Sequence, residues 1–468
     1  MNNKKNIIKN LIFAFLAQSI SMILSVLMSL IVPKALGVEE FGYWQLFIFY
    51  SSYIGFFHLG LNDGIYLKLG GEEYENLDKE KIGSQLKLSL VIESLVAIII
   101  SIIAFVFIKD EKRFFSILFT AISIPVICGT GFIGYIFQSV NKTRIYSISV
   151  MIDKILFIIS VVALLLLKCE NFKYFVILYV IGKIIAFAYC LYVGRKIVFS
   201  KFNNIKQTMI DIINNIKIGI NLMISNIASQ LIIGSTRFFI DTKWGVETFG
   251  KVSLSLSITN FFLTFISQIS MVLFPVLRNV KEENQKKYYT YIKEIIEIIL
   301  FTILLFYLPI KRILVLWLPK YTESLYYLGI LLPICIFDSK MNLLCNTYFK
   351  VLRKEKSILK INVISLIISI LLSLVNIYIF NDMNMVIIGI IISVAARCVI
   401  SEIYLAKLME TSAIRDVLVE ILMSTVFIVS NFIVKDVYAF VIYLVTFAIY
   451  AFINKSNIMN YLRKIKKV

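Results

Sequence analysis

The feature that most constrains this chain is a series of apolar stretches of about 20 residues that recurs along its whole length. A helix of that length spans the hydrocarbon core of a bilayer, which is about 30 Å thick. Hydrophobic residues make up 59% of the 468 positions and charged residues only 16%, whereas soluble domains contain about half and about a quarter. The sequence therefore predicts an all-α protein that crosses a membrane many times.

We expect fourteen membrane helices, at 10–32, 41–63, 84–108, 114–138, 145–167, 172–193, 217–239, 248–275, 291–310, 323–347, 358–380, 384–406, 414–434 and 436–453. The first of them, Leu11–Val32, is too long for the core of a cleaved signal peptide and has no small-residue cleavage site. We therefore expect it to be retained. Pro309, Lys311 and Arg312 interrupt the ninth segment before an apolar ILVLWLP stretch resumes.

Lysine and arginine are distributed unevenly between alternate loops. The richer loops contain Lys4, Lys5, Lys9, Lys142, Arg144, Arg195, Lys196, Lys201, Lys206, Arg278, Lys281, Lys286, Lys287, Lys350, Arg353, Lys354, Lys356, Arg463, Lys464, Lys466 and Lys467. The poorer loops contain Lys34, Lys112, Arg113 and Lys243. Because basic loops stay on the cytoplasmic side, we expect both termini in the cytoplasm of a bacterium and the chain in its cytoplasmic (inner) membrane. This distribution accounts for the net charge of +19 without nucleic-acid binding.

Several kinds of chemistry find no support in the sequence. The six cysteines show no CxxC spacing and lie mostly in apolar stretches, as small buried side chains do. His58 is the only histidine, which leaves a His-based triad or a zinc site almost without ligands. No GxxxxGK[ST] motif indicates ATP use. No predicted outer loop exceeds about a dozen residues, so a membrane glycosyltransferase or polymerase has no place for its catalytic groups. We expect no enzyme activity, cofactor or metal.

One short phrase occurs twice. GVEEFG begins at Gly37 and returns almost unchanged as GVETFG at Gly245. Each copy follows one apolar segment and opens the next, so we expect both first glycines to end a helix in a left-handed conformation. The glutamates that follow suit the positive end of the next helix. Pro125 and Pro333 repeat at the same separation, although the chain has only six prolines. The two landmarks together indicate an internal duplication.

The duplication implies six membrane helices, six more and an additional pair. Because six is even, both halves cross the membrane in the same sense. We therefore expect two lobes related by a pseudo-twofold axis along the membrane normal, as in transporters that rock two lobes about a central cavity. The predicted division is an N-terminal lobe at 1–205, a C-terminal lobe at 206–410, and a helix pair with a basic cytoplasmic tail at 411–468.

Four stretches carry a resemblance to a known family. They are PKALGVEEFGYWQL at 33–46, HLGLNDGIYLKLGG at 58–71, STRFFIDTKWGVETFGKVSLSLS at 235–257 and VLFPVLRN at 272–279. With the order of six, six and two helices, they resemble the oligosaccharide flippases (Wzx-like polysaccharide biosynthesis and export proteins) of the multidrug/oligosaccharidyl-lipid/polysaccharide exporter superfamily. The resemblance covers essentially the whole chain.

The resemblance implies that the protein moves undecaprenyl-pyrophosphate-linked oligosaccharide units to the outer leaflet, for O-antigen, capsule or a cell-wall polymer. It implies that the protein binds this polyprenyl-linked oligosaccharide. Contact between the protein and the polysaccharide polymerase machinery is a further possibility. Nothing in the sequence demands a second subunit, so we expect a monomer. The first segment has neither the acidic residue of many drug/cation antiporters nor the arginines of lipid II flippases. Both departures favour the oligosaccharide branch.

Ionisable residues inside a bilayer usually face a partner or a watery cavity, so each is a candidate site. Those in the predicted membrane segments are Glu93, Asp153, Lys154, Lys183, Arg237, Asp338, Lys340, Arg397 and Glu402. A pyrophosphate-linked lipid needs cations where its head group crosses, and guanidinium matches phosphate geometry. We expect a cationic cavity formed by Arg237, Arg397, Lys340, Lys154, Lys183 and Lys34. Asp338, Glu93 and Asp153 are candidates for carrying a coupling proton, with a Na⁺ gradient or the membrane potential as alternatives.

Structural roles compete with these functional ones. Arg237 and Asp241 are four residues apart, so a local ion pair is as plausible as a substrate contact. Lys34 lies at a helix end, where its side chain could simply reach the interface.

The remaining charges pose the same choice. Lys183 could pair with either Glu93 or Asp153 to hold helices together. Asp338 and Lys340 are two positions apart and point to opposite helix faces. Each of them therefore needs another partner or the cavity.

The main alternative function is an antiporter of the same fold that exports cationic drugs against protons or other cations. Acids rather than bases should line its cavity, so the charge of the cavity separates the two hypotheses. Sugar stacking on Tyr43, Trp44, Trp244 or Trp317 is a further hypothesis, although such residues are common at membrane interfaces.

Overall fold

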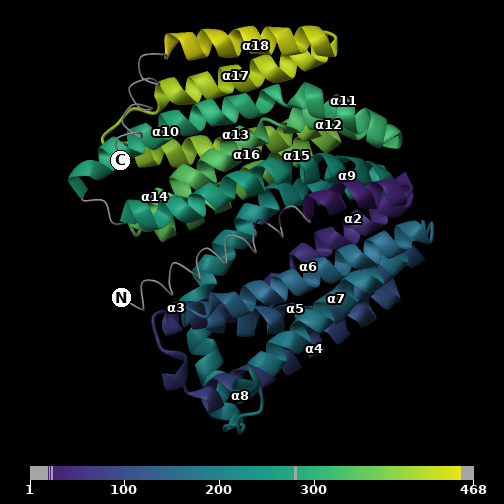
Figure 1. Cartoon of the computed structure of the whole chain (residues 1–468), viewed down its shortest axis with the longest axis vertical. Coiled ribbons are helices and arrows are strands. Elements are labelled where there is room, and N and C mark those ends of the chain that lie inside the picture. Colours follow the sequence, from purple (N-terminus) through teal and green to yellow (C-terminus); the bar gives the residue numbers. More distant parts are fainter. Residues whose placement is uncertain (1–18, 20–21, 23–24, 279–281, 455–468) are drawn as a thin grey trace. The chain divides into compact units, whose positions relative to one another are not determined.

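The computed structural model describes residues 19, 22, 25–278 and 282–454, and this part of the chain contains helices and loops but no strand (Figure 1). Ten of its helices are long and apolar enough to cross a membrane, or eleven if the bent pair Pro319–Leu331 and Ile334–Val351 is one span. The prediction of an all-α multi-pass membrane protein is confirmed. The count of fourteen stays a prediction, because the segment 10–32 and the basic tail lie largely outside the described residues.

The described chain packs into two compact units. Unit 1 contains the residues up to Ile227 together with Trp244–Gly250, and unit 2 contains Ala228–Lys243 and the residues from Lys251 onward. Residues 206–227, which belong to the predicted C-terminal lobe, pack with unit 1. The three-part division of the sequence stays a prediction.

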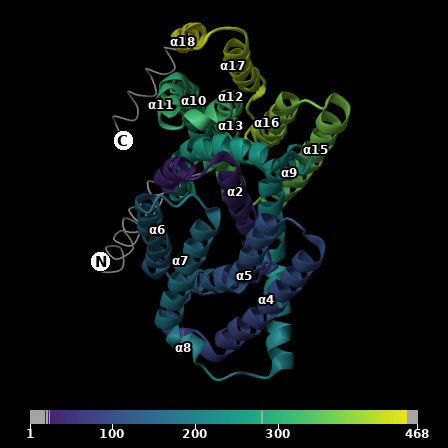
Figure 2. The same ribbon diagram turned by 90° about the vertical axis from the view of Figure 1, so that its right-hand side faces the viewer.

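Unit 1 is built around four long helices that pack side by side and are joined by short loops (Figure 2). Its elements are α2 (Val38–Ser52), η1 (Ile54–Phe56), α3 (Leu61–Leu69), η2 (Tyr74–Asn76), α4 (Lys79–Phe107), α5 (Glu111–Ser139), α6 (Thr143–Leu166), α7 (Phe172–Val193) and α8 (Arg195–Val198). Asp78, Asp110 and Asn171 cap α4, α5 and α7 by accepting hydrogen bonds from first-turn amides. These caps fix where the long helices begin.

The prediction of one helix over 41–63 is wrong, because α2 and α3 are separated by a break. Leu59 has φ 52° and Gly60 has φ 87°, and two successive positive φ values turn the backbone out of a right-handed helix. The break places His58 and Asn62 at one end of a cavity that is described below.

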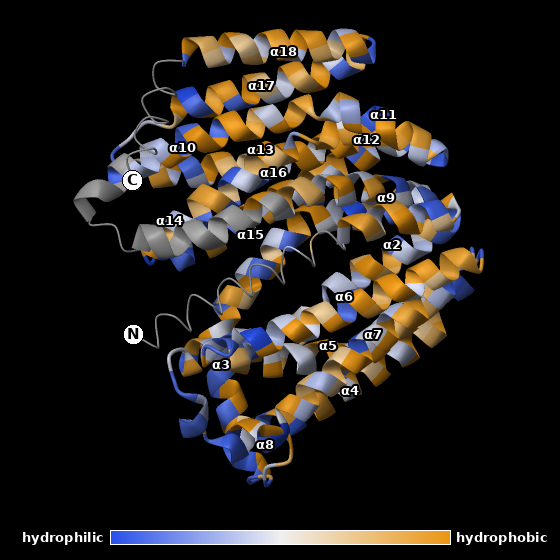
Figure 3. Cartoon of the chain, viewed as in Figure 1, coloured by the Kyte–Doolittle hydropathy of each residue, from blue (hydrophilic) through white to orange (hydrophobic). Residues whose placement is uncertain are grey.

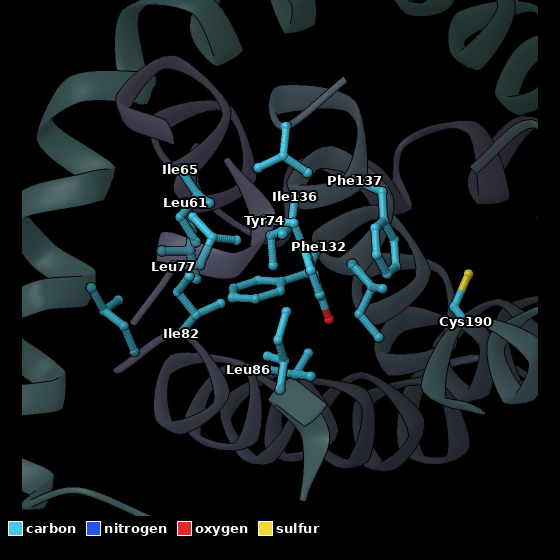
Figure 4. Close-up of a cluster of buried hydrophobic side chains, with 14 residues drawn as sticks. Leu61, Ile65, Tyr74, Leu77, Ile82, Leu86, Phe132, Ile136, Phe137 and Cys190 are labelled. Atoms are coloured by element: carbon cyan, nitrogen blue, oxygen red, sulfur yellow. The ribbon is translucent and has the colours of Figure 1, made fainter. Parts of the chain in front are cut away.

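A hydrophobic cluster holds one end of unit 1 together (Figure 4). Leu61 and Ile65 of α3 pack there with Leu86 of α4 and with Phe132 and Ile136 of α5. Figure 3 shows hydrophilic residues gathered around α3 and α8 at this end, while the long helices are apolar along most of their length. This colouring is what a bundle that crosses a bilayer requires.

Unit 2 is formed largely by α9 and the helices that follow it. These elements are α9 (Ile205–Arg278), α10 (Glu282–Leu305), α11 (Tyr307–Trp317), η3 (Pro319–Tyr321), α12 (Thr322–Leu331), α13 (Ile334–Lys340), η4 (Met341–Cys345), α14 (Asn346–Val351), α15 (Glu355–Val375), η5 (Asn376–Phe380), α16 (Met383–Leu408), α17 (Ile414–Ile433) and α18 (Asp436–Ile453). Within this unit α10 packs against α13, α17 and α18, and α13 packs against α16. The predicted helices at 217–239 and 248–275 both lie in α9, which is kinked at Gly245.

Prolines explain two breaks in unit 2. Pro309 lies in the first turn of α11, and its ring would clash with the carbonyl group of Leu305, where α10 ends. Pro333 separates α12 from α13 in a pair of helices bent by 50°. Pro125, its counterpart in the repeat, lies inside α5 without ending the helix. The predicted single helix over 323–347 is therefore wrong.

The two copies of the repeated phrase contact each other inside unit 1. A Cβ atom on Gly250 would lie 2.8 Å from the Gly42 Cα atom, and one on Gly42 would lie 2.5 Å from the Val246 carbonyl oxygen. Glycine is therefore required where α2 meets α9.

The first glycines of the two phrases differ in conformation. Gly245 has φ 83°, so the expectation of a positive φ is confirmed there. For Gly37 it is wrong, because φ −66° and ψ 167° make it an extended N-cap of α2, the usual conformation before a helix. Glu39 and Glu40 lie in the first turn of α2, as predicted, and contact Lys112 at 2.7 and 2.8 Å.

Candidate functional site

A polar cavity of about 270 Å³ lies inside unit 1, between α5, α6, α7 and the break that separates α2 from α3. Its lining residues are Gly55, His58, Asn62, Ile127, Cys128, Thr130, Gly131, Tyr135, Tyr146, Ser149, Val150, Asp153, Lys183 and Ala186. The lining thus combines hydroxyl groups, an amide, an imidazole and one ion pair. Such a set can hydrogen-bond to a polar ligand within a membrane-spanning bundle.

The ion pair in this cavity joins α6 to α7. Lys183 Nζ contacts Asp153 Oδ2, and the ammonium group also lies 5.1 Å from the centre of the Tyr179 ring. The Lys183 side chain is 23% exposed, whereas the Asp153 side chain is 6% exposed. Asp153 Oδ1 has no hydrogen-bond partner among the described residues. Of the two partners that the sequence left open for Lys183, the structure selects Asp153.

Lys154 lies beside this pair. It follows Val150, a lining residue, by one turn of α6, so the two side chains share a helix face. Among the described residues Lys154 has no hydrogen bond or ion pair. Lys154 does not itself line the cavity, but it adds a second lysine beside the Asp153–Lys183 pair.

The segment between α2 and α3 contributes His58 to the cavity lining. The Gly60 amide donates a hydrogen bond of 3.0 Å to His58 Nδ1, so this nitrogen is unprotonated. Asp63 Oδ2 lies 4.0 Å from His58 Nε2, and Asn62 donates to the Cys128 carbonyl oxygen at 3.3 Å. Sequence reasoning missed these lining residues. The available signal was a histidine and an asparagine at the end of an apolar segment.

Glu93 of α4 is buried but does not line the cavity. It has no ion pair with any described residue, and its Oε2 atom accepts no hydrogen bond there. The structure therefore separates Glu93 from Asp153, although both were candidates for carrying a coupling proton.

Unit 2 contains a second group of buried charges, centred on Lys340 at the C-terminal end of α13. Its Nζ atom lies 3.3 Å from Glu297 Oε1 and 2.8 Å from Glu402 Oε2, and it contacts Glu420 Oε1. The side chains of Lys340, Glu402 and Glu420 are fully buried, and that of Glu297 is 4% exposed. We call these four residues the Lys340 cluster. Four different helices supply them.

Two further ion pairs lie in unit 2. Arg397 Nη1 lies 3.2 Å from Asp338 Oδ1, and Arg397 Nε donates to Asn362 Oδ1 at 2.9 Å. Lys293 contacts Asp416 and donates to the Ser412 carbonyl oxygen at 3.3 Å. Each of these pairs has one cation for one carboxylate.

Asp338 and Lys340 each find a separate partner, as their positions on opposite faces predict. The π-helical segment η4 begins directly after Lys340. Its wider turn changes the helical register at this point. Asn342 in this segment donates to Asp338 Oδ2 at 3.0 Å.

The remaining predicted cations lie elsewhere. Arg237 Nη2 donates to Ser253 Oγ at 2.8 Å within unit 2, and Lys34 is exposed. Arg237, Arg397 and Lys340 belong to unit 2, whereas Lys34, Lys154 and Lys183 belong to unit 1. The role of these residues as lining of one cationic cavity stays a prediction.

Sequence reasoning missed Glu297, Glu420, Lys293 and Asp416. Their positions inside the predicted segments 291–310 and 414–434 were the available sign.

The aromatic candidates have structural contacts. Trp44 is stacked on Phe157 with centroids 5.4 Å apart and is bordered by further rings, and the Tyr43 hydroxyl donates to Asp110 at 2.6 Å.

Residues 7–281, more than half of the chain, match the family model described as "Polysaccharide biosynthesis protein". The chain belongs to this family. No curated protein sequence matches it at a significant level. The resemblance stated from the sequence is confirmed at the level of the family.

Solved structures of the same fold include transporters of the MOP superfamily. An inward-facing multidrug resistance MATE family transporter of that superfamily matches with a TM-score of 0.67 and 14% identity, covering 85% of this chain and 98% of that one. The lipid II flippase MurJ, in an inward closed conformation, matches with a TM-score of 0.64 and 15% identity, covering 96% and 100%. At sequence identities this low, the structural similarity establishes the fold alone. The fold is therefore one that this chain shares with a solved transporter and a solved flippase.

A third solved structure bears on how the cavity is interpreted. It is a MOP superfamily transporter from Pyrococcus furiosus, described as having a binding pocket of reverse polarity that suggests a different function. It matches with a TM-score of 0.55 and 12% identity, covering 87% of this chain and 96% of that one. Function within this fold thus depends on the cavity residues of each member.

Proposed function

We propose that this membrane transporter flips undecaprenyl-pyrophosphate-linked oligosaccharide units across the bacterial cytoplasmic membrane during synthesis of a surface polysaccharide. The observation that carries the proposal is the polar cavity of unit 1, which Lys183 lines and Lys154 adjoins on α6, in a member of the polysaccharide biosynthesis family. The finished polymer is an O-antigen, a capsule or a cell-wall polymer.

The chemistry of the cavity matches a head group made of sugar and phosphate. Tyr135, Tyr146, Ser149 and Thr130 present hydroxyl groups, which can donate to and accept from the hydroxyl groups of a sugar. A lysine without an acidic partner offers a point charge for a phosphate. Its burial beside an apolar bundle strengthens such a contact, because the local dielectric constant is low.

In this proposal the oligosaccharide unit moves by alternating access between two lobes, and the lipid tail remains in the bilayer. Both termini lie in the cytoplasm, as the basic loops predict. The protein works as a monomer without enzyme activity and delivers its product to the polymerase machinery. A gradient of protons or Na⁺, or the membrane potential, drives the cycle.

The test uses cells that lack this protein and measures lipid-linked sugars in their membranes. We expect precursors to accumulate in the inner leaflet and the wild-type protein to clear them. Lys154→Met should express at wild-type level and reduce clearance about ten- to one hundred-fold, because it removes one charged contact to phosphate. Lys154→Arg retains the charge and should retain most of the activity.

Lys360→Met is the matched control, since Lys360 is exposed on α15. It should clear precursors like the wild type. Absence of accumulation in the deletion strain would contradict the flippase proposal, and equal clearance by Lys154→Met and Lys360→Met would contradict the role of Lys154.

The alternative is an antiporter for cationic drugs, which the MATE-like fold favours. A cationic drug would require an excess of acids, whereas Asp153, the one carboxylate of the cavity lining, is paired with Lys183. The same strains distinguish the two functions, because loss of an antiporter raises drug sensitivity without accumulation of lipid-linked sugars.

A further inference from the structure

Among the buried groups of ion-paired residues in the described chain, the Lys340 cluster has more carboxylates than cations and the others do not. With every group ionised, the three carboxylates of Glu297, Glu402 and Glu420 and the single ammonium group of Lys340 would carry a net charge of −2. Asp153–Lys183, Asp338–Arg397 and Asp416–Lys293, by contrast, are balanced one to one. Among these four groups of ion-paired residues, the excess charge is specific to the Lys340 cluster.

The buried residues around the cluster supply no compensating cation, and Arg415, which lines the adjoining small cavity, is exposed. The ionisable groups that face the cluster from the packed helices are Tyr289, Lys293, Cys345, Cys398, Asp416 and Tyr450. Lys293 is already engaged by Asp416, and the others are neutral phenols and thiols. An uncompensated charge buried in a protein interior is so unfavourable that the group takes up a proton instead.

Unsatisfied oxygen atoms identify where such protons fit. The Oε1 atom of Glu402 and the Oε2 atom of Glu420 are buried without a hydrogen-bond partner among the described residues, and Glu402 Oε2 meets the Lys340 ammonium group at 2.8 Å. A carboxyl group that keeps its proton can donate to a neighbouring carboxylate, and close carboxylates commonly share protons in this way. Protonation would therefore give these oxygen atoms hydrogen bonds and would also remove the excess negative charge.

A small cavity leads to the cluster. It has a volume of about 40 Å³ and is bounded by Glu294, Glu297, Ile298, Arg415, Asp416, Val419, Tyr450 and Asn454 of α10, α17 and the end of α18. A space of this size holds a few ordered water molecules. Glu297 lies between this cavity and the sealed interior, since its Oε1 atom faces Lys340 and its Oε2 atom accepts from the Tyr450 hydroxyl at 3.3 Å.

We propose that Glu297, Glu402 and Glu420 form a proton-binding site in unit 2, which is loaded from the small cavity through Glu297. Water in the cavity relays a proton from a hydronium ion of the bulk solvent to Glu297, and the proton then passes to Glu402 or Glu420 as Glu297 returns to its carboxylate form. That this proton is the coupling ion of the transport cycle rests on the proposed function. The binding site itself does not.

A proton fits this site better than a metal ion. Carboxylate oxygens of Glu297, Glu402 and Asp416 lie within 4.8 Å of one another, which would suit a cation. The Lys340 ammonium group, however, already lies at 2.8 and 3.3 Å from two of these carboxylates. A metal ion would have to displace it, whereas a proton needs no additional space.

Proton binding at this site favours the sealed arrangement of α10, α13, α16 and α17. With the proton lost, the cluster would carry more negative charge than the interior tolerates, and a conformation that admits water would become favourable. The proton thus binds more tightly to the closed form of unit 2 than to any open form. This difference is what allows a proton gradient to bias a conformational equilibrium.

Infrared spectroscopy of the purified full-length protein, in detergent and without any lipid-linked substrate, tests the proposal. The measurement follows the carbonyl band of protonated carboxyl groups and its shift in D₂O. A Glu93→Gln background removes a buried carboxyl group of unit 1 that has no ion pair with any described residue. We expect this protein to retain the band at neutral pH.

Variants assign the band. Glu402→Gln/Glu420→Gln should abolish it, and each single change should weaken it. Asp338→Asn, which removes a carboxylate balanced by Arg397, should leave it unchanged and serves as the control. A folded Glu93→Gln protein without the band would overturn the proposal even if no other variant folds. Loss of the band on addition of Na⁺ at constant pH would overturn it in favour of a metal cation.

Failure of this experiment is distinguishable from failure of the proposed function. Precursor accumulation in the deletion strain does not depend on how transport is coupled, and the infrared band does not depend on the substrate. If clearance of precursors persists while the band is absent, a proton site is excluded and the flippase function stands.

Discussion

Lys183 in unit 1 and Lys340 in unit 2 are both lysines that meet carboxylates inside a membrane bundle, yet their surroundings differ. Lys183 has one partner, Asp153, and part of its side chain reaches a cavity of about 270 Å³. Lys340 has three glutamates around it and is fully buried. The Lys183 arrangement leaves a cation available to a ligand. In the Lys340 arrangement, the single cation is surrounded by more carboxylates than it can neutralise.

This difference shows that the charge of a buried residue does not by itself reveal its role. A charge beside a cavity can exchange a protein partner for a ligand, since water or ligand atoms can replace the lost contact. A charge sealed in the interior cannot do so, because breaking its contacts leaves the partners without compensation. Stability and transport should therefore respond in opposite ways to substitutions at the two sites.

The largest effect on stability is expected at Lys340. Lys340→Met leaves three buried carboxylates without their cation, and removal of one partner from a buried ion pair costs about 3–5 kcal/mol. The free energy of unfolding, measured by denaturation of the purified protein in mild detergent, should fall by that amount. Lys340→Met/Glu402→Gln/Glu420→Gln should recover most of it, because the remaining carboxyl group can be protonated. A Lys340→Met protein as stable as Lys183→Met would break the comparison.

A smaller loss is expected at Arg397. Arg397→Met removes hydrogen-bonding contacts to Asp338 and Asn362, which corresponds to about 2–3 kcal/mol of unfolding free energy. Arg397→Lys keeps the charge but loses the planar donor geometry, so it should recover only part of this loss. The same denaturation experiment measures both variants, and full recovery by lysine would show that only the charge matters there.

Lys183→Met should lower the free energy of unfolding by only about 1–2 kcal/mol, because the cavity lets water solvate Asp153. Its effect on transport should be large, since the lysine faces the proposed ligand site. The ratio of precursor clearance to the amount of folded protein in the membrane separates the two effects. Loss of clearance only in proportion to loss of folded protein would make the Asp153–Lys183 pair purely structural.

The smallest effect on stability is expected at Lys154, which has no ion pair among the described residues. Lys154→Met should change the free energy of unfolding by less than about 0.5 kcal/mol while reducing clearance of lipid-linked precursors. Thermal denaturation beside the clearance assay checks this prediction. A strong destabilisation would reveal a structural role that the described contacts do not explain.

Much of the architecture could be predicted from the sequence, because membrane helices are encoded locally. The long apolar segments correspond to α4–α7 and α15–α18 with small changes in their ends. The predictions failed where backbone geometry departs from a simple helix, as between α2 and α3, where Leu59 and Gly60 have positive φ. Nothing in the hydropathy of 41–63 reports such a break.

The candidate sites were predicted less completely. Their charged residues in the membrane were recognised, and the opposite faces of Asp338 and Lys340 correctly required two separate partners. The partners themselves, Arg397 for one and Glu297, Glu402 and Glu420 for the other, were not foreseen.

The sequence by itself determined that this protein is a multi-pass helical membrane protein of the polysaccharide biosynthesis family, because apolar length and short motifs are properties of neighbouring residues. Only the tertiary structure decided which carboxylates surround which lysine. The residues of the Lys340 cluster come from four helices far apart in the chain, and their meeting depends on how those helices cross. Whether a lysine reaches a cavity or is sealed from water depends on the same packing, which no local pattern encodes.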